Sequence, residues 1–308
     1  MIDIVQMTSS KRLQDVIDLF NEGVRTHPWS AHLDRSSWEA TIGQRSTYDP
    51  KMVLIAYEGE RRRGYVHLGN APLADNSGPD STVGSVEALF FPADRPDVGA
   101  ALLAAARSTL KDVGARMIFG WSSFSWYPLY RGLHVGLEPM ALASDRHVTA
   151  AFIAAGFRQI QHNVIMVADP IGMPPPAQAG VHLEIATGRW SPRDAWAAGS
   201  WTGLKPFKSV AMVEGEEAGH CIYSVLPSLG TAPDTVVGGI GELGTVEKWR
   251  RVGVAAVLVS RAVEHLRELG VNRLVLITQH DNLAAQATYE RVGMRVEQST
   301  VGFELTSA

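Results

Sequence analysis

The sequence predicts a mixed α/β (α+β) protein built from two similar units in tandem. Its 308 residues are 45% hydrophobic and 19% charged, and this length suits two domains of about 150 residues better than one core. A proline-rich stretch, Asp169 to Pro176, lies near the middle of the chain. Three consecutive prolines fit neither a helix nor a central strand, so this stretch predicts a linker. The same order of elements follows on either side of it.

Each unit has the pattern of a strand, a helix, a hairpin, a long amphipathic helix, a strand, a helix and final strands. The hairpins are expected over 52–68 and 209–225, and the second unit's first helix from Ser191 and Pro192. Gly99 and Ala255 each stand 15 residues before a glycine, Gly114 or Gly270, that would end the long helix. We therefore expect a first unit over 1–168, a Pro-rich linker over 169–180 and a second unit over 181–308.

Composition excludes several classes of function. The formal net charge of −4 argues against a nucleic-acid partner, which would require a gathered basic face. No segment has the length of an apolar membrane span and the N-terminus lacks a signal pattern, so we expect no membrane partner and a cytoplasmic location. The single cysteine, Cys221, is expected to be a small buried hydrophobe. No Cys/His or Asp/His cluster has metal-ligand spacing, so we expect no metal.

The chemically informative segment is 244–255, where an apolar strand runs into a basic, glycine-containing turn and a helix starts at once. The first turn of such a helix presents unpaired N–H groups and the positive end of its dipole, which suit a pyrophosphate. Gly253 would allow close backbone approach, Ala255 keeps the next turn small, and Arg250 and Arg251 add positive charge.

Two ordered motifs resemble the GNAT acyltransferase superfamily. Arg250-x-x-Gly253-x-Ala255 is similar to that family's acyl-CoA signature. The second signature, Asn-x-x-Ala-x-x-x-Tyr-x-x-x-Gly-Phe, is matched at Asn282, Ala285, Tyr289 and Gly293, with Met294 in place of the phenylalanine. The tandem arrangement resembles mycothiol synthase-like bacterial acetyltransferases.

This resemblance implies two tandem GNAT-type domains, each a mixed, mostly antiparallel sheet flanked by helices, and acetyl-CoA as acyl donor. The strands before and after the long helix would splay apart to admit the pantetheine arm. The implied cofactor-binding residues are Thr245, Val246, Arg250, Arg251, Val252, Gly253, Val254, Ala255, Asn282 and Tyr289.

The resemblance also implies that Tyr289 protonates the departing thiolate, since a phenol stays protonated at neutral pH. Glu242 is the candidate general base, expected to face away from Leu243. An exposed carboxylate with no catalytic role is an equal alternative for Glu242, and His220 and His280 are weaker candidates for the base.

The first unit departs from these motifs. If Gly99 takes the place of Ala255, then Asp97 stands at Gly253 and Asp94 at Arg250. Carboxylates there would cap the helix and repel a phosphate. In the second motif, Phe152 replaces the tyrosine. We therefore expect a degenerate first unit that does not catalyse.

The first unit also carries an additional segment rich in aromatic residues and glycine, from Trp121 to Met140. It includes Trp126-Tyr127-Pro128 and Glu138. Loops of this kind either line a ligand site or simply cover strands.

The expected function is acetyl transfer from acetyl-CoA to a primary amine, on a small molecule or peptide, by direct attack in a ternary complex. The alternative is a non-catalytic acyl-CoA-binding sensor or scaffold. Aminoacyl transfer from charged tRNA is disfavoured by the acidic balance of the chain.

Overall fold

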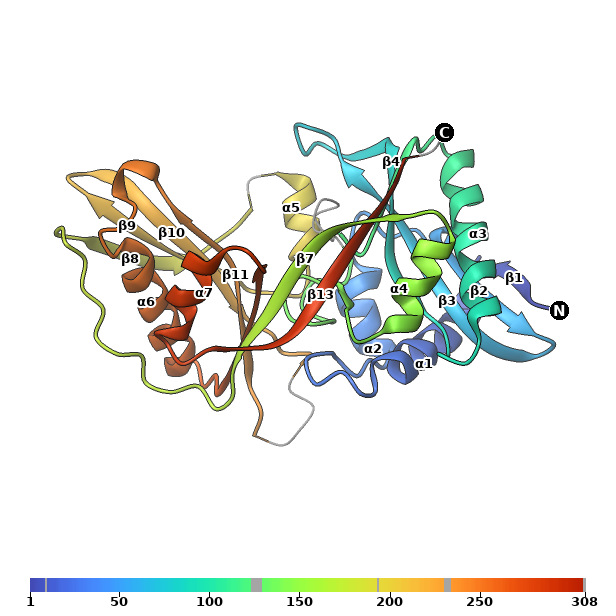
Figure 1. Ribbon diagram of the computed structural model, residues 1–308, viewed down its shortest axis with the longest axis horizontal. Coiled ribbons are helices and arrows are strands. Elements are labelled where there is room, and N and C mark those ends of the chain that lie inside the picture. The colour runs from blue at the N-terminus through green and yellow to red at the C-terminus, as the bar shows by residue number, and fades with distance from the viewer. Residues whose placement is uncertain (9, 123–128, 193, 230–233, 307–308) are drawn as a thin grey trace.

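The mixed α/β fold expected from the sequence is confirmed. The computed structural model describes residues 1–8, 10–122, 129–192, 194–229 and 234–306, and Figure 1 shows two lobes joined by long central strands. The strands of the described residues are β1 (Asp3–Gln6), β2 (Val53–Glu58), β3 (Arg61–Pro72), β4 (Pro79–Phe90), β5 (Met117–Gly120), β6 (Ala141–Leu142), β7 (Arg158–Ala168), β8 (Glu184–Arg189), β9 (Phe207–Val213), β10 (Glu216–Val225), β11 (Val237–Thr245), β12 (Arg273–Gln279) and β13 (Arg295–Thr306). The helices are α1 (Leu13–Val24), α2 (Arg35–Trp38), α3 (Pro96–Asp112), α4 (Arg146–Ala154), α5 (Ala195–Ser200), α6 (Val254–Glu268) and α7 (Leu283–Glu290).

The two halves exchange their last strands. Along the sheet the order is β1-β2-β3-β4-β5-β13-β7-β12-β11-β10-β9-β8, with β6 beside β13. β7, from the first half, pairs antiparallel with β12 of the second, while β13, from the end of the chain, pairs antiparallel with β5 of the first. The two exchanged strands also pair with each other, and they run side by side between the lobes in Figure 1. Each half therefore depends on the other for a sheet neighbour.

The hydrophobic cores reflect the same exchange. The core of the first half takes in Val301 and Phe303 from β13, and the core of the second takes in Val164 and Met166 from β7. The division at 1–168, 169–180 and 181–308 thus stays a proposal about two repeats, each of which completes its sheet with a strand of the other.

The long helices occupy equivalent places in the two halves. α3 packs on β2, β3 and β4, and α6 packs on β9, β10 and β11. The glycines that follow them, Gly114 and Gly270, have φ of +106° and +86°, so both long helices end as predicted. α5 starts later than expected: Asp194, rather than Ser191, accepts the capping hydrogen bond from the Ala197 N–H at 2.7 Å.

The parallel strand pair beside each long helix is joined only at one end. β4 pairs with β5 over Val83–Val86, and β11 pairs with β12 over Val237–Gly239. Beyond Gly239, β11 continues to Thr245 beside β10, while β12 continues to Gln279 beside β7. The two strands therefore have different neighbours beyond Gly239, which agrees with the expected splay.

No helix among the described residues is both long and apolar enough to span a bilayer.

Candidate active site

The start of α6 offers an uncapped helix N-terminus. Gly253 is its N-cap residue with φ of +96°, no side chain caps the helix, and its first turn holds no acidic residue. Arg251, just before it, also has a positive φ of 65°. Four N–H groups at such an end have no partner within the helix, and the dipole is positive there. Together with Arg250 and Arg251, both exposed, this turn has the charge and the free N–H groups that suit an anion such as a pyrophosphate.

Gly253 is also required by a contact that the sequence did not reveal. A Cβ on this residue would lie 2.5 Å from the Gln178 carbonyl oxygen and 2.9 Å from Ala179 Cα. Next to them, the Gly180 N–H donates to the Val252 carbonyl at 2.7 Å. The Pro-rich linker therefore packs on the turn, and a side chain at Gly253 would displace the chain's own backbone.

Backbone groups at the end of β11 are partly occupied. The Val246 N–H donates to the Ala218 carbonyl at 2.9 Å, and the Val246 carbonyl accepts from the Trp249 N–H at 2.9 Å. Arg250 Nε donates to the Thr245 carbonyl at 3.4 Å, which ties the turn to the strand. A ligand at Val246 would therefore have to share its carbonyl, because the N–H is already bonded.

Asn282 has a local structural role. Its Oδ1 accepts from the Ala285 N–H at 3.2 Å and so caps α7. This cap fixes the start of the short helix that carries Tyr289.

Tyr289 is 6% exposed in the core of the second half. Burial, followed by the charges of Cys221 and Glu138, raises the pKa of its phenol well above the usual value. Its hydroxyl therefore stays protonated at neutral pH, as a general acid must, but the raised pKa makes it a weaker proton donor than an ordinary phenol.

Glu242 forms part of a short polar chain on β10 and β11. His220 Nε2 lies 3.0 Å from Glu242 Oε1, and His220 Nδ1 lies 2.8 Å from Glu217 Oε1. The bond to His220 lowers the pKa of Glu242, and the bond to Glu242 raises the pKa of His220. With its pKa lowered, Glu242 is a weaker base than an ordinary glutamate, and its carboxylate is hydrogen-bonded to His220.

The strand register shows which face of the sheet Glu242 occupies. Glu242 stands opposite Ile222, and Leu243 stands opposite Cys221. Cys221 belongs to the core beneath α6, whereas Ile222 belongs to the core shared with the first half. Glu242 therefore points away from Leu243, as alternation predicts, and toward the first half.

The remaining candidates from the sequence lie elsewhere or have other roles. His280 is exposed and lies 5.7 Å from His162, ring centre to ring centre. Cys221 is buried and unpaired, and burial raises the pKa of its thiol. Among the described residues, no group of three or more His, Cys, Asp or Glu side chains is placed to hold a metal ion.

In the first half, the position expected for the acid is apolar. Phe152 is fully buried and stacks on Phe303 at 4.5 Å and edge-on against Phe157 at 5.0 Å. This half thus has no phenol at that position, and the ring serves packing.

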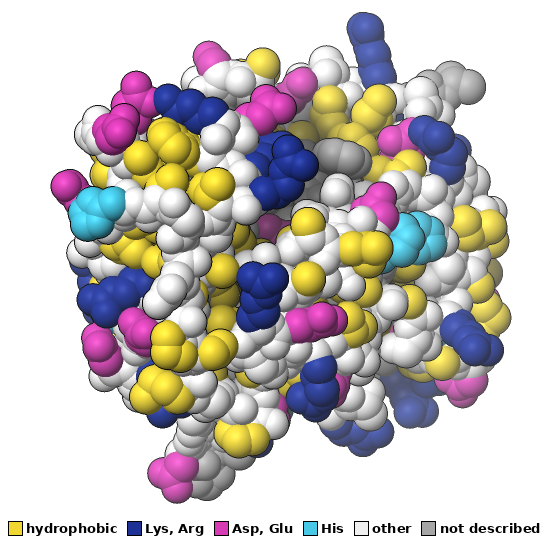
Figure 2. Space-filling view, turned by 60° about the vertical axis from the view of Figure 1, so that its left-hand side comes forward, with side chains coloured by type: hydrophobic (Ala, Val, Ile, Leu, Met, Phe, Trp, Pro, Cys, Tyr) yellow, Lys and Arg dark blue, Asp and Glu magenta, His cyan; other side chains and the backbone are white. Residues whose placement is uncertain are grey.

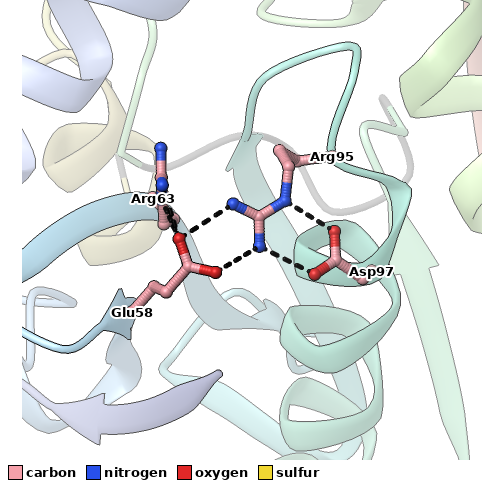
Figure 3. A network of polar contacts seen from close by, with 4 residues as sticks. All are labelled: Glu58, Arg63, Arg95 and Asp97. Atoms are coloured by element: carbon pink, nitrogen blue, oxygen red, sulfur yellow. Dashed lines mark hydrogen bonds and ion pairs between the residues drawn. The ribbon is translucent and has the colours of Figure 1, made fainter. Parts of the chain in front are cut away.

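The start of α3 is filled by an ion-pair network. Arg95 donates to both oxygens of Asp97, at 2.9 and 2.8 Å, and to both oxygens of Glu58, at 3.2 Å each; Arg63 also pairs with Glu58 (Figure 3). Arg95 lowers the pKa of Asp97 to about 2. The expectation that Asp97 is the N-cap was wrong, since Arg95 is the N-cap residue and no side chain caps the helix. Asp97 nevertheless places negative charge in the first turn.

The first half also contains a cleft that the sequence did not predict. Its volume is about 800 Å³, and its lining includes the end of β4, Trp121, His27, Asp145 and the arginines of the β2–β3 hairpin. His27 Nε2 lies 3.2 Å from Asp145 Oδ2. The first half can therefore hold a ligand in this cleft, although Asp97 offsets the positive end of the α3 dipole.

The additional segment of the first half is described only in part. Trp126, Tyr127 and Pro128 lie outside the described residues, whereas residues 129–140 are almost all buried. On the face shown in Figure 2, basic and acidic side chains are interspersed with hydrophobic ones, and neither sign is gathered into one area.

Comparison with known proteins identifies the second half. Residues 181–294 match the family model described as "Acetyltransferase (GNAT) family". The C-terminal half is therefore similar to GNAT acetyltransferases over this range. No curated protein sequence matches the chain.

Solved structures show that the whole chain has the fold of tandem GNAT proteins. A tandem GNAT protein from the clavulanic acid biosynthesis pathway is 15% identical, with a TM-score of 0.69 over 100% of this chain and 99% of that one. A GCN5-related N-acetyltransferase from Sphaerobacter thermophilus is 14% identical, with a TM-score of 0.64 over 100% and 98%. A glucosamine N-acetyltransferase region of a fungal multi-domain β-N-acetylglucosaminidase is 17% identical, with a TM-score of 0.67; the match covers 99% of this chain but 38% of that protein.

Proposed function

We propose that the C-terminal GNAT domain transfers an acetyl group from acetyl-CoA to a primary amine by direct attack in a ternary complex. The observation that carries the proposal is the uncapped, carboxylate-free start of α6 beside two arginines. In the first half, the matching helix start carries Asp97 bound to Arg95. Acetyl-CoA would supply the activated acyl group as a thioester.

The residues of the second half have distinct roles in this proposal. The amine nitrogen forms the new C–N bond and loses a proton, which Glu242 accepts with His220 as its partner. As the C–S bond breaks, Tyr289 donates its proton to the sulfur. Two carboxylates beside one imidazole, Glu217 and Glu242, stabilise the protonated form of His220.

The test is release of CoA thiol by the full-length chain with a panel of primary amines. Wild type should release thiol faster when an acceptor is present. Tyr289→Phe should lower kcat by about 10²–10⁴ and leave the acetyl-CoA Kd near the wild-type value. Tyr57→Phe, which removes a hydroxyl bonded to Asp15 in the first half, is the matched control and should behave as wild type. A Tyr289→Phe protein with most of the wild-type turnover would exclude Tyr289 as the acid.

A second candidate function is acyl-CoA binding without turnover, and the cleft of the first half favours it. That cleft has room for a large ligand, and Phe152 cannot donate a proton. A sensor of this kind would be stabilised by acetyl-CoA, by about 2.7 kcal/mol at a hundredfold excess over Kd, yet release no thiol with any amine. The location in the cytoplasm stays a prediction from the sequence.

A further inference from the structure

The Pro-rich linker is fixed at both ends of α6. Near the C-terminal end of α6, the Ile171 N–H donates to the Asn272 carbonyl at 2.8 Å, and Arg267 donates to the Ile171 carbonyl at 3.2 Å. Near the N-terminal end, the Gly180 N–H donates to the Val252 carbonyl at 2.7 Å. Figure 1 shows the linker passing along the outer side of α6 between these two points.

The linker has little slack between these two anchors. α6 has 15 residues and is therefore about 22 Å long. The residues from Ile171 to Gly180 reach about 28 Å in the polyproline conformation that consecutive prolines favour. Ile171 is 8% exposed and belongs to the core of the second half, which fixes the first anchor. Gly180 is therefore held close to the turn before α6.

The turn before α6 has an unfavourable backbone conformation. Arg251 has a φ of 65° and Gly253 a φ of 96°, and the value at Arg251 is a left-handed one at a residue with a side chain. Such a conformation persists where neighbouring contacts hold it. The linker supplies two of these contacts. One is the hydrogen bond from Gly180 to the Val252 carbonyl, and the other is the Gln178 carbonyl, which packs on Gly253.

The hydrogen bond from Gly180 also orients the peptide group between Val252 and Gly253. This peptide is trans, and the C=O and N–H of a trans peptide point in opposite directions. Because its carbonyl is turned to the linker, its N–H, on Gly253, is directed away from the linker. Among the described residues, no backbone acceptor is bonded to the N–H of Val252 or of Gly253. Successive unbonded N–H groups of this kind form a concavity that binds anions.

We propose that the Pro-rich linker positions the acetyl-CoA site, and that the Gly180 N–H, by holding the Val252 carbonyl, keeps the Gly253 N–H free for the pyrophosphate. If the peptide reversed, the carbonyl oxygen would take the place of that N–H and repel a phosphate. Gly180 is a positioning residue, since it acts through Val252. The inference rests on the proposed function, because acetyl-CoA is the donor of that reaction. It adds that the affinity for the donor depends on the segment that joins the two halves.

The experiment compares three variants of the full-length chain. Gly180→Pro removes the N–H. Gly180→Ala keeps it, and its Cβ would lie 3.8 Å from the Val252 oxygen, an ordinary contact. Ala177→Pro, next to Pro176, removes an N–H for which the described part of the chain holds no backbone acceptor.

In calorimetry, Gly180→Pro should raise the acetyl-CoA Kd about three- to tenfold, as expected for the loss of one hydrogen bond. Gly180→Ala and Ala177→Pro should bind acetyl-CoA as wild type does. In Gly180→Pro the KM for acetyl-CoA should rise by the same factor as the Kd, while kcat and the KM for the amine stay at the wild-type values.

A second measurement needs no variant. In wild type without ligand, the Gly180 amide should exchange its hydrogen more slowly than the amide of Gly172, because the Gly180 N–H is bonded. Gly172 lies in the same linker, is exposed and has no backbone acceptor within the described ranges. Equally fast exchange at the two amides would overturn the inference, even if Gly180→Pro failed to fold.

The variants can contradict the inference in other ways. Wild-type affinity for acetyl-CoA in Gly180→Pro would remove the linker from the site and leave the proposed function standing. Equal weakening in Ala177→Pro would assign the effect to any added proline. A lower kcat and a lower Tm of the free Gly180→Pro protein, together with a higher Kd, would show structural damage instead of positioning. A wild-type protein that binds no acetyl-CoA would overturn the proposed function and this inference together.

Discussion

His220 joins two carboxylates, Glu217 and Glu242, through contacts of 2.8 and 3.0 Å. A histidine held in this way stays protonated to higher pH than usual, because both neighbours favour the imidazolium. A base formed by Glu242 and His220 would therefore become fully competent above the ordinary titration range of a histidine.

Glu242→Gln removes the main cause of the raised pKa of His220. We expect a lower rate at neutral pH that recovers in part at higher pH, where the free amine prevails. A pH–rate profile of wild type and variant from pH 6 to 10 measures this. Superimposable profiles would assign the proton to water or to another residue.

Glu87, on β4 of the first half, is a second titratable group whose pKa is strongly shifted by its surroundings. It is fully buried, and burial raises its pKa from 4.5 to about 7, partly offset by the charge of Arg45. A raised carboxyl pKa means that the protonated form favours the folded state. Stability from this group is thus complete below pH 4.5 and is lost as the pH rises through about 7.

Glu87→Gln keeps a neutral side chain at every pH. Wild type should therefore lose about 1–3 kcal/mol of unfolding free energy relative to the variant between pH 4.5 and 7.5. Urea unfolding of both proteins across that range provides the measurement. Parallel stability curves would show that the carboxyl titrates normally.

The two long helices differ at their first turns although they are alike along their length. α6 starts without a carboxylate and beside Arg250, whereas α3 starts with Asp97 bound to Arg95. The start of α6 should therefore bind an anion more strongly than the start of α3, because a fixed carboxylate competes with a phosphate for the same N–H groups and dipole.

Charge reversal at Arg250 tests this contrast more cleanly than a change at Gly253, where any side chain would also meet the linker. Arg250→Glu should weaken acetyl-CoA binding at least tenfold in calorimetry and raise its KM. Asp97→Asn removes the matching carboxylate of the first half and should leave kcat and the KM for acetyl-CoA at the wild-type values. If Asp97→Asn, and not Arg250→Glu, changed turnover, the active site would lie in the first half.

The sequence predicted helices and hairpins well, and loops poorly. The hairpins and the glycines at the ends of the long helices follow from patterning and from the need for a positive φ, both of which are local properties. The residue-by-residue correspondence between the two units, with Gly99 in the place of Ala255, does not hold in the loop before α3. β4 pairs from Val83 and β11 from Val237, while β5 and β12 begin at Met117 and Arg273. The first half thus has two fewer residues than the second between these two strands. A comparison by sequence spacing alone did not allow for this difference, and it predicted Asp97 as the N-cap residue.

The candidate site was predictable only where a motif covered it. Arg250, Gly253 and Tyr289 lie in local signatures, and the structure places them on the predicted turn and helix. The contacts of Gly253 with Gln178 and of Leu137 with β11 join segments far apart in the chain. No local pattern encodes such contacts, so the packing of the linker on the Gly253 turn entered the description of the site only with the fold.

At the scale of the whole molecule, the exchanged strands make the two halves interdependent. Without β7, strand β12 would lose its antiparallel neighbour, and without β13 the same would hold for β5. Each half alone would expose a sheet edge and part of its core, which promotes aggregation.

We expect that residues 1–172 and 173–308 expressed separately are insoluble or unfolded, and that co-expression yields a soluble, co-purifying pair. Circular dichroism and size-exclusion chromatography of the separate and combined fragments measure this. A second fragment that is monomeric and cooperatively folded by itself would show that its sheet does not need β7.

The pairing of β5 with β13 also has a consequence for synthesis on the ribosome. Gly120 pairs with Phe303 and Met117 with Thr306, so the partner of an early strand is made only after the whole of the second repeat that precedes it. At about 5–20 residues per second the delay is on the order of 10 s, and during it the nascent first half has an incomplete sheet. Tandem domains usually fold one after the other as they are made. The first half of this chain cannot complete its sheet in that order, because it needs β13. We expect the emerging edge of β5 to be a binding site for chaperones until β13 has left the ribosome and paired with it.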